Sequence, residues 1–126
     1  MCQMLLSINP KYVKEILNGK KKYEYRKFRC RSDVNKIIIY STAPEKKVVG
    51  EAEIEEIIED EKMKVWNITK NYSGISYDFY EEYYKEKKYA YAYRLKNIIE
   101  YEEAKSLSDY GVDYAPQSYR YLYSEA

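Results

Sequence analysis

Hydrophobic and polar positions at the start of the chain follow first a strand pattern and then a helix pattern. Residues 5–8 are mostly apolar and predict a short strand. Asn9 then offers an N-cap side chain and Pro10 suits the first helical position. Apolar residues recur on one helical face until Gly19, a residue that favours the left-handed turn ending a helix. We therefore expect a strand followed directly by a helix.

Three further strands are predicted before residue 60. Residues 22–26 alternate strictly between charged side chains and tyrosines, which places the two kinds on opposite faces of a strand. Residues 37–40 are continuously apolar, as is typical of a strand covered on both faces. Residues 48–58 alternate again, but the adjacent Glu55 and Glu56 break the parity. We expect a β-bulge or the end of the strand near that pair.

The second half of the chain predicts two helices, a long strand and a short closing helix. Residues 62–69 have helical spacing, and Ser76 is placed to cap a second helix whose aromatic residues recur through 79–84. Strand alternation returns over residues 89–101. Residues 119–122 are expected to form the short terminal helix.

These elements predict an α+β fold of about five to six strands arranged as a small β-barrel. One helix follows the first strand, and a helical insertion precedes the last long strand. The connections are too short and irregular for repeated βαβ units. No repeat or linker divides the sequence, so residues 1–126 are expected to form one domain.

Tyrosine is the outstanding feature of the composition. The chain has 18 tyrosines and only two phenylalanines. A tyrosine supplies core bulk together with a hydroxyl group that needs a partner, so we expect many of these rings at the edge of the core. An AT-rich genome would explain the excess, and the alternative is a dedicated aromatic binding surface.

Charge is balanced overall but uneven along the chain. The net charge is +1, which lacks the basic excess of a general nucleic-acid binder. Acidic residues concentrate in 51–61, whereas the basic ones gather within twelve positions near the N-terminus. The basic group consists of Lys20, Lys21, Lys22, Arg26, Lys27, Arg29 and Arg31. This region is either a surface that faces an anion or a solvated edge that keeps the protein soluble.

The absence of histidine excludes several kinds of site. Catalytic triads and dyads that use an imidazole base are impossible, and so is histidine-ligated zinc. Cys2 and Cys30 are too few for a structural zinc site, so we expect no metal and no cofactor. Isolated cysteines without a signal peptide favour a reduced, cytoplasmic protein. No apolar run approaches the ~20 residues of a membrane span, so no membrane partner is expected.

The strongest chemical signal lies just after the first predicted helix. A lysine, a carboxylate and an arginine follow Gly19 at Lys21, Glu24 and Arg26. An acid between two bases can orient both, and the planar guanidinium can bind a phosphate or a base edge. The alternative is a ladder of cross-strand ion pairs on a wet sheet face.

The same residues form a Gly-x-Lys-x-x-Glu-x-Arg pattern that resembles the signature of ASCH domains. Flanking segments resemble the family in the same order along the chain. They are Leu5-Leu6-Ser7-Ile8 with Pro10, Ile39-Tyr40-Ser41-Thr42, Val49-Gly50-Glu51, Tyr72-Ser73-Gly74-Ile75-Ser76 and Pro116-Gln117-Ser118. The resemblance covers nearly the whole chain and implies a PUA-like barrel with a cleft between barrel and helices.

The resemblance also implies a function that involves RNA, a nucleotide or a modified nucleoside. ASCH domains are viewed as RNA- or nucleotide-binding modules, and some members are N4-acetylcytidine amidohydrolases or ribonucleases. The catalytic lysine of the amidohydrolases matches Lys21. Their threonine three residues later is replaced by Glu24, and their glutamate in the helical insertion falls near Tyr72.

The expected site follows from both lines of reasoning. A lysine among other cations in a partly buried cleft has a lowered pKa, so Lys21 could be a nucleophile or base, with Glu24 relaying a proton, if the chain is an enzyme. The expected nucleotide- or RNA-binding residues are Lys21, Glu24, Arg26, Tyr40, Ser41, Gln117 and Ser118. Ser118 could instead cap the closing helix. Glu51, Glu53 and Glu55 are about 7 Å apart along their strand, too far to share a metal, so a solvated face is expected there.

Overall fold

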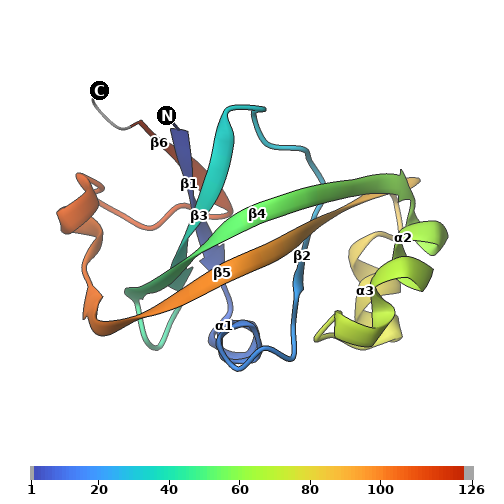
Figure 1. The fold of residues 1–126 in the computed structure, drawn as a ribbon, viewed down its shortest axis with the longest axis horizontal. Coiled ribbons are helices and arrows are strands. Elements are labelled where there is room, and N and C mark those ends of the chain that lie inside the picture. The colour runs from blue at the N-terminus through green and yellow to red at the C-terminus, as the bar shows by residue number, and fades with distance from the viewer. Residues whose placement is uncertain (1, 124–126) are drawn as a thin grey trace.

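The computed structural model describes residues 2–123, through which a six-stranded sheet runs (Figure 1). The strand order is β2-β5-β4-β3-β1-β6. Neighbouring strands are antiparallel except for β1 and β3, which are parallel. In chain order the elements are β1 (Cys2–Ile8), α1 (Pro10–Leu17), β2 (Tyr23–Arg26), β3 (Val34–Ser41), β4 (Lys47–Glu61), α2 (Lys62–Thr69), η1 (Lys70–Tyr72), α3 (Tyr77–Tyr83), β5 (Tyr89–Lys105), η2 (Leu107–Tyr110) and β6 (Tyr119–Tyr123).

The prediction of an α+β fold is confirmed, with a qualification about the barrel. Helix α1 follows the first strand, and the helical insertion precedes the long strand β5, as expected. However, β2 and β6 are the two edges of the described sheet. The sheet is therefore open, and the term barrel fits it only loosely.

Local capping signals placed the helices correctly. The Asn9 side chain accepts a hydrogen bond from the Lys11 amide at 2.9 Å, and Gly19 has φ +83° just beyond α1. The Ser76 hydroxyl accepts a bond from the Phe79 amide at 3.1 Å at the start of α3. Both helix starts are thus fixed by side chains that the sequence identified.

Strands β4 and β5 form a long ribbon that crosses the molecule, with the helical insertion at one end (Figure 1). Their register shifts between Ile54 and Glu56, which confirms the expected bulge. At the end of the ribbon that carries the insertion, the Lys62 amide donates to the carbonyl oxygen of Lys88 at 3.0 Å. The insertion therefore leaves and rejoins the ribbon at adjacent points.

The prediction of a closing helix was wrong. Residues 119–123 form strand β6, which pairs antiparallel with β1. Tyrosines at alternate positions suit a strand, and β1 offers an edge to pair with. Ser118 accordingly caps no helix: its carbonyl oxygen accepts a bond from the Ser7 amide at 3.0 Å.

Apolar clusters cover both faces of β3, as its continuous apolar run predicted. Ile37 and Ile39 pack in the cluster that contains α1, whereas Ile38 and Tyr40 belong to a cluster on the other face. A third cluster joins β2 and β5 to the helical insertion. Helix α1 and the insertion are thereby held on either side of β2.

Several tyrosines lie deeper than the core edge that was expected. Tyr80, Tyr84 and Tyr93 are at most 1% exposed. Their hydroxyls donate to backbone carbonyls, of Lys62 at 2.7 Å, Arg26 at 2.6 Å and Phe28 at 2.7 Å respectively. These bonds satisfy the buried hydroxyls, and two of them tie down the backbone around β2.

The helices of residues 2–123 include none with the length and apolar character that a membrane crossing requires.

Candidate functional site

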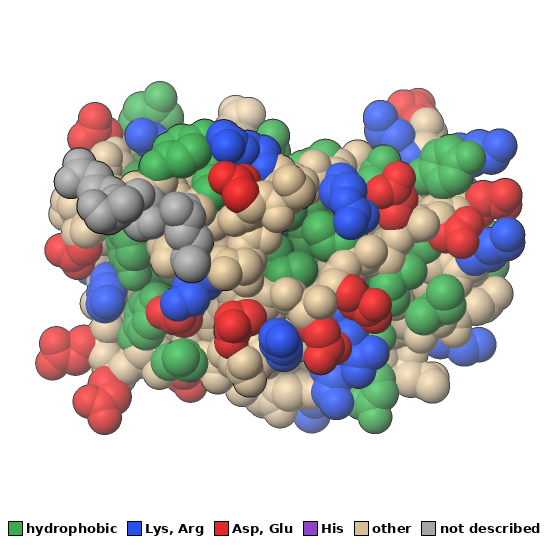
Figure 2. Space-filling model, turned by 45° about the horizontal axis from the view of Figure 1, so that its top comes forward, with side chains coloured by type: hydrophobic (Ala, Val, Ile, Leu, Met, Phe, Trp, Pro, Cys, Tyr) green, Lys and Arg blue, Asp and Glu red, His purple; other side chains and the backbone are tan. Residues whose placement is uncertain are grey.

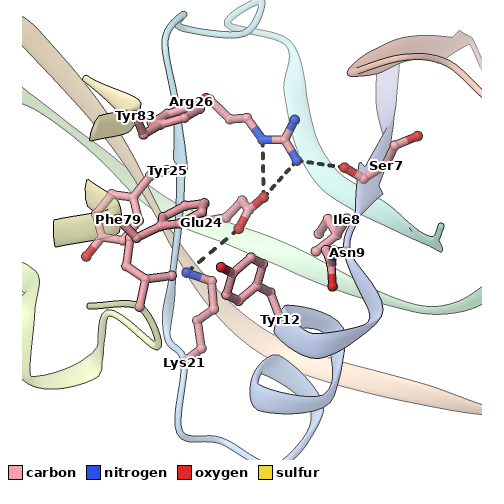
Figure 3. A pocket seen from close by; sticks show the side chains of 11 residues that line it. Ser7, Ile8, Asn9, Tyr12, Lys21, Glu24, Tyr25, Arg26, Phe79 and Tyr83 are labelled. Atoms are coloured by element: carbon pink, nitrogen blue, oxygen red, sulfur yellow. Dashed lines mark hydrogen bonds and ion pairs between the residues drawn. The ribbon is translucent and has the colours of Figure 1, made fainter. Parts of the chain in front are cut away.

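A cavity of about 210 Å³ opens between the end of β1, helix α1, strand β2 and the helical insertion (Figure 3). It is lined by Ser7, Ile8, Asn9, Tyr12, Lys21, Glu24, Tyr25, Arg26, Ile75, Phe79 and Tyr83. The expected trio of Lys21, Glu24 and Arg26 thus meets at one recess, with side chains that point toward one another.

Lys21 is fixed in this recess by the insertion. It is only 1% exposed, and its ammonium nitrogen Nζ donates to the carbonyl oxygen of Ser73 at 2.6 Å. The aliphatic stem passes directly over Gly74, where an added Cβ would lie 2.5 Å from the Cβ of Lys21. The Lys22 amide also donates to the Tyr72 carbonyl at 2.9 Å. Segment 72–74 therefore sets the position of the amine.

Burial makes the Lys21 amine less basic than an ordinary lysine. Desolvation lowers its pKa, Glu24 raises it again in part, and Arg26 lowers it further. The attraction from Glu24 is modest because its Oε1 lies 3.9 Å from Nζ. The net effect is a lowered pKa, so a larger fraction of the Lys21 amine is neutral at a given pH.

Glu24 and Arg26 form a tight pair at the other side of the recess. Oε2 of Glu24 accepts from Nη2 of Arg26 at 2.7 Å and from Nε at 3.2 Å. The same guanidinium donates to the Ser7 carbonyl at 2.9 Å and to the Ser118 hydroxyl at 3.1 Å. Arg26 is therefore held in a single orientation by partners in β1, in β2 and in the segment before β6.

Aromatic rings complete the walls of the cavity. The Lys21 nitrogen lies 4.9 Å from the ring centre of Tyr25 and 5.7 Å from that of Tyr12. Phe79 packs against Tyr12 with ring centres 5.6 Å apart and is 47% exposed. Tyr83 lies near Arg26, and its pKa is raised by burial. A flat group that enters the recess would meet ring surfaces beside two cations.

Sequence reasoning did not identify these aromatic residues as part of the site. The sequence pattern assigns Tyr12 to the apolar face of the first helix, and it assigns the aromatic residues of 79–84 to helical spacing alone. Their place beside the charged strand comes from the packing of α1 and α3 around β2, which no local pattern in the sequence indicates.

The remaining predicted residues lie in different places. Tyr40 is 5% exposed in the cluster on the opposite face of β3, and Ser41 is completely buried at the end of that strand. Within residues 2–123, the Ser41 hydroxyl is the buried side-chain group with no hydrogen-bond partner. Gln117 and Ser118 are exposed and line a separate hollow beside β6. Of these four, Ser118 reaches the cavity indirectly, through Arg26.

Most of the basic segment does not line the cavity. Lys22 and Lys27 lie over the rings of Tyr72 and Tyr83, with the ammonium nitrogens 4.3 and 4.5 Å from the ring centres. Arg29 pairs with an acid across the surface. Figure 2 likewise shows basic and acidic side chains interspersed over the visible face, with no patch of one sign. The anion-facing character is thus concentrated at Lys21 and Arg26.

No group of three or more acidic or cysteine side chains that could hold a metal occurs within the described range, residues 2–123. Glu51 pairs instead with Lys36 at 2.7 Å and accepts from the Tyr101 hydroxyl at 2.9 Å. These contacts lower the pKa of Glu51, led by the hydrogen bond from Lys36. At this point of the acidic stretch, the charge of Glu51 on the sheet surface is balanced by Lys36.

Similarity to known proteins agrees with this architecture. The crystal structure of ASCH from Zymomonas mobilis superposes with a TM-score of 0.86 and 25% identity, covering 96% of this chain and 87% of that one. An ASCH domain-containing ribonuclease from the same species is 28% identical over 96 residues, which are 75% of this chain and 65% of that protein.

A ribosomal protein provides a second type of relative. Large ribosomal subunit protein uL22 of Ureaplasma parvum is 29% identical over 120 residues, covering 94% of this chain. The chain spans only 39% of the length of that protein. The model of the ASCH domain matches residues 6–106, which include α1, the charged strand β2 and the helical insertion. The chain therefore belongs to the ASCH domain family.

Proposed function

We propose that this protein binds RNA and holds one nucleotide of it in the cavity around Lys21, Glu24 and Arg26. The observation that carries the proposal is the convergence of two buried or half-buried cations with only one carboxylate between them. The recess keeps one positive charge, which suits a phosphate group.

The size and walls of the cavity support a nucleotide as the guest. A volume of about 210 Å³ is smaller than the ~300–1,000 Å³ of pockets that enclose drug-sized ligands. One base or one sugar phosphate is a suitable occupant, and the rest of an RNA chain would lie outside. The rings of Tyr12 and Phe79 offer surfaces on which a base can stack.

The names of two relatives support a function that involves RNA. One of them is named a ribonuclease and another is a ribosomal protein, and both names concern RNA. The chain spans only 39% of the ribosomal protein and 65% of the ribonuclease. An RNA-related activity of this chain is therefore a proposal.

Replacing Lys21 with methionine tests this proposal. The substitution keeps the buried stem and removes only the ammonium group, and Lys22→Met is the matched control because the neighbouring side chain is exposed. We expect Lys21→Met to weaken the binding of a labelled RNA oligonucleotide at least tenfold, measured by fluorescence anisotropy. Lys22→Met should change the affinity less than threefold. Equal affinities for both variants would refute the assignment of the cavity.

A second candidate function is hydrolysis, either of an RNA phosphodiester or of N4-acetylcytidine. It is favoured by the lowered pKa of Lys21, whose amine in its neutral form can accept a proton from a ribose hydroxyl or attack an acyl group. Incubation with short RNAs and with N4-acetylcytidine, with and without chelator, tests it. Turnover that persists in chelator and disappears in Lys21→Met, but not in Lys22→Met, would establish a metal-independent enzyme.

A further inference from the structure

A second aromatic surface lies outside the cavity, along the edge of the sheet. The rings of Phe28 and Tyr119 stack with centres 4.3 Å apart and planes within 21° of parallel. Tyr121 follows on the same face of β6, with its ring 5.4 Å from that of Tyr119. The Arg31 guanidinium lies 5.7 Å from the ring centre of Tyr121. We refer to Phe28, Tyr119, Tyr121 and Arg31 as the edge strip.

The edge strip begins where the cavity ends. Arg26 lines the cavity and donates to the hydroxyl of Ser118, the residue directly before Tyr119. Phe28 follows Arg26 by two positions and lies against Tyr119. A continuous series of contacts therefore leads from the phosphate-binding recess to the stacked rings.

The first ring of the strip is both accessible and rigid. Tyr119 is 38% exposed, although Phe28 covers one of its faces. Alternate residues of a strand lie about 7 Å apart, so Tyr121 follows Tyr119 as a second ring, half-buried against the core. A ring already supported by its neighbour loses little freedom when a base stacks on it.

The charges beside the strip suit a phosphate backbone. Arg31 is exposed, and its Nη2 pairs with Asp33 at 3.2 Å while Nη1 donates to the Tyr123 hydroxyl at 2.6 Å. A guanidinium held in this way keeps its planar face over a ring and can exchange its acidic partner for a phosphate. Arg120 lies at the adjacent hollow of about 500 Å³, together with Gln117.

We propose that the edge strip binds the nucleotides of single-stranded RNA that adjoin the one held in the cavity, by stacking a base on Tyr119 beside the half-buried ring of Tyr121. This inference rests on the proposed function, since it extends the same RNA chain beyond the recess. Aromatic platforms of this kind are tolerant of sequence, because every base has a flat face. The strip therefore contributes affinity and a preference for unpaired RNA, rather than a choice of base.

Two RNA lengths separate the strip from the cavity. An RNA dinucleotide reaches little beyond the recess, whereas an unstructured octanucleotide of mixed sequence also covers the strip. We expect the wild-type protein to bind the octanucleotide at least tenfold more tightly than the dinucleotide. We expect Tyr119→Leu to reduce octanucleotide affinity about tenfold and to leave dinucleotide affinity unchanged. Tyr89→Leu, at a 48% exposed tyrosine of β5 outside both surfaces, is the matched control.

The outcomes distinguish the two proposals. Equal affinity of the wild-type protein for both lengths would overturn the edge strip, even if Tyr119→Leu failed to fold. Identical behaviour of Tyr119→Leu and Tyr89→Leu would overturn it too. The cavity proposal survives either result, provided that Lys21→Met still lowers the affinity for the dinucleotide. Failure of the wild-type protein to bind either RNA would overturn both.

Discussion

Gly74 provides a sharp test of how the insertion positions the cavity amine. Its φ is +68°, and an added Cβ would approach three carbons of the Lys21 stem at 2.5–2.8 Å. Real side chains do not occupy such contacts, so Gly74→Ala must move either the segment or the lysine. The matched control is Gly111→Ala, because Gly111 has φ +71° and nothing within 4 Å of its added Cβ.

Both substitutions carry a backbone penalty, and only Gly74→Ala also carries a packing penalty. Alanine in the left-handed region costs about 1–2 kcal/mol of stability at either position. Overpacking of the Lys21 stem adds about 1–3 kcal/mol for Gly74→Ala alone. The total of about 2–5 kcal/mol is a large part of the ~5–15 kcal/mol that typically stabilises a domain.

Urea unfolding and RNA binding measure the two consequences separately. We expect Gly111→Ala to lower the unfolding midpoint by the backbone penalty alone and to keep wild-type RNA affinity. Gly74→Ala should lower the midpoint further and, under conditions where it remains folded, weaken RNA binding at least tenfold. A folded Gly74→Ala protein with wild-type affinity would refute the claim that segment 72–74 sets the position of Lys21.

Two other predictions follow from groups near the cavity. Burial lowers the pKa of Lys21 in the folded chain, so the unfolded chain holds that proton more tightly between the lowered pKa and the ordinary value of 10.5. Stability of the wild-type protein relative to Lys21→Met should therefore rise with pH toward 10.5, and urea unfolding that shows a constant difference from pH 7 upward would contradict this. Tyr84→Phe removes the 2.6 Å bond to the Arg26 carbonyl and should cost about 1–3 kcal/mol in the same assay, because it leaves a buried acceptor without its partner. A loss below about 0.3 kcal/mol would show that water or a neighbour replaces the hydroxyl.

Local signals carried the successful part of the prediction from sequence. Asn9, Gly19 and Ser76 fix helix ends through their own backbone and side-chain chemistry, so their effect is readable from a few residues. The parity break at Glu55 and Glu56 likewise marked the register shift in β4. Strand parity made Glu24 and Arg26 readable as neighbours on one face. Lys21 lies before β2, so parity does not select it, and the resemblance to ASCH domains did.

Long-range contacts explain what the sequence did not reveal. Strand β6 pairs with β1 from the other end of the chain, and no local pattern identifies such a partner. Tyr40 follows three isoleucines, and a continuous apolar run does not tell which face each residue takes, so its burial away from the cavity was unreadable. The carbonyl of Ser73 holds Lys21 through the backbone, which every residue type shares.

The junction of the insertion with the β4–β5 ribbon separates two tasks within one small protein. Glu61 and Tyr89 are paired neighbours, so the 27 residues between them, 62–88, begin and end at a single rung of the ladder. Exchanging that segment would leave strand register untouched while replacing one wall of the recess. Chimeras between ASCH relatives, joined at this rung, would therefore transfer guest selectivity without rebuilding the scaffold.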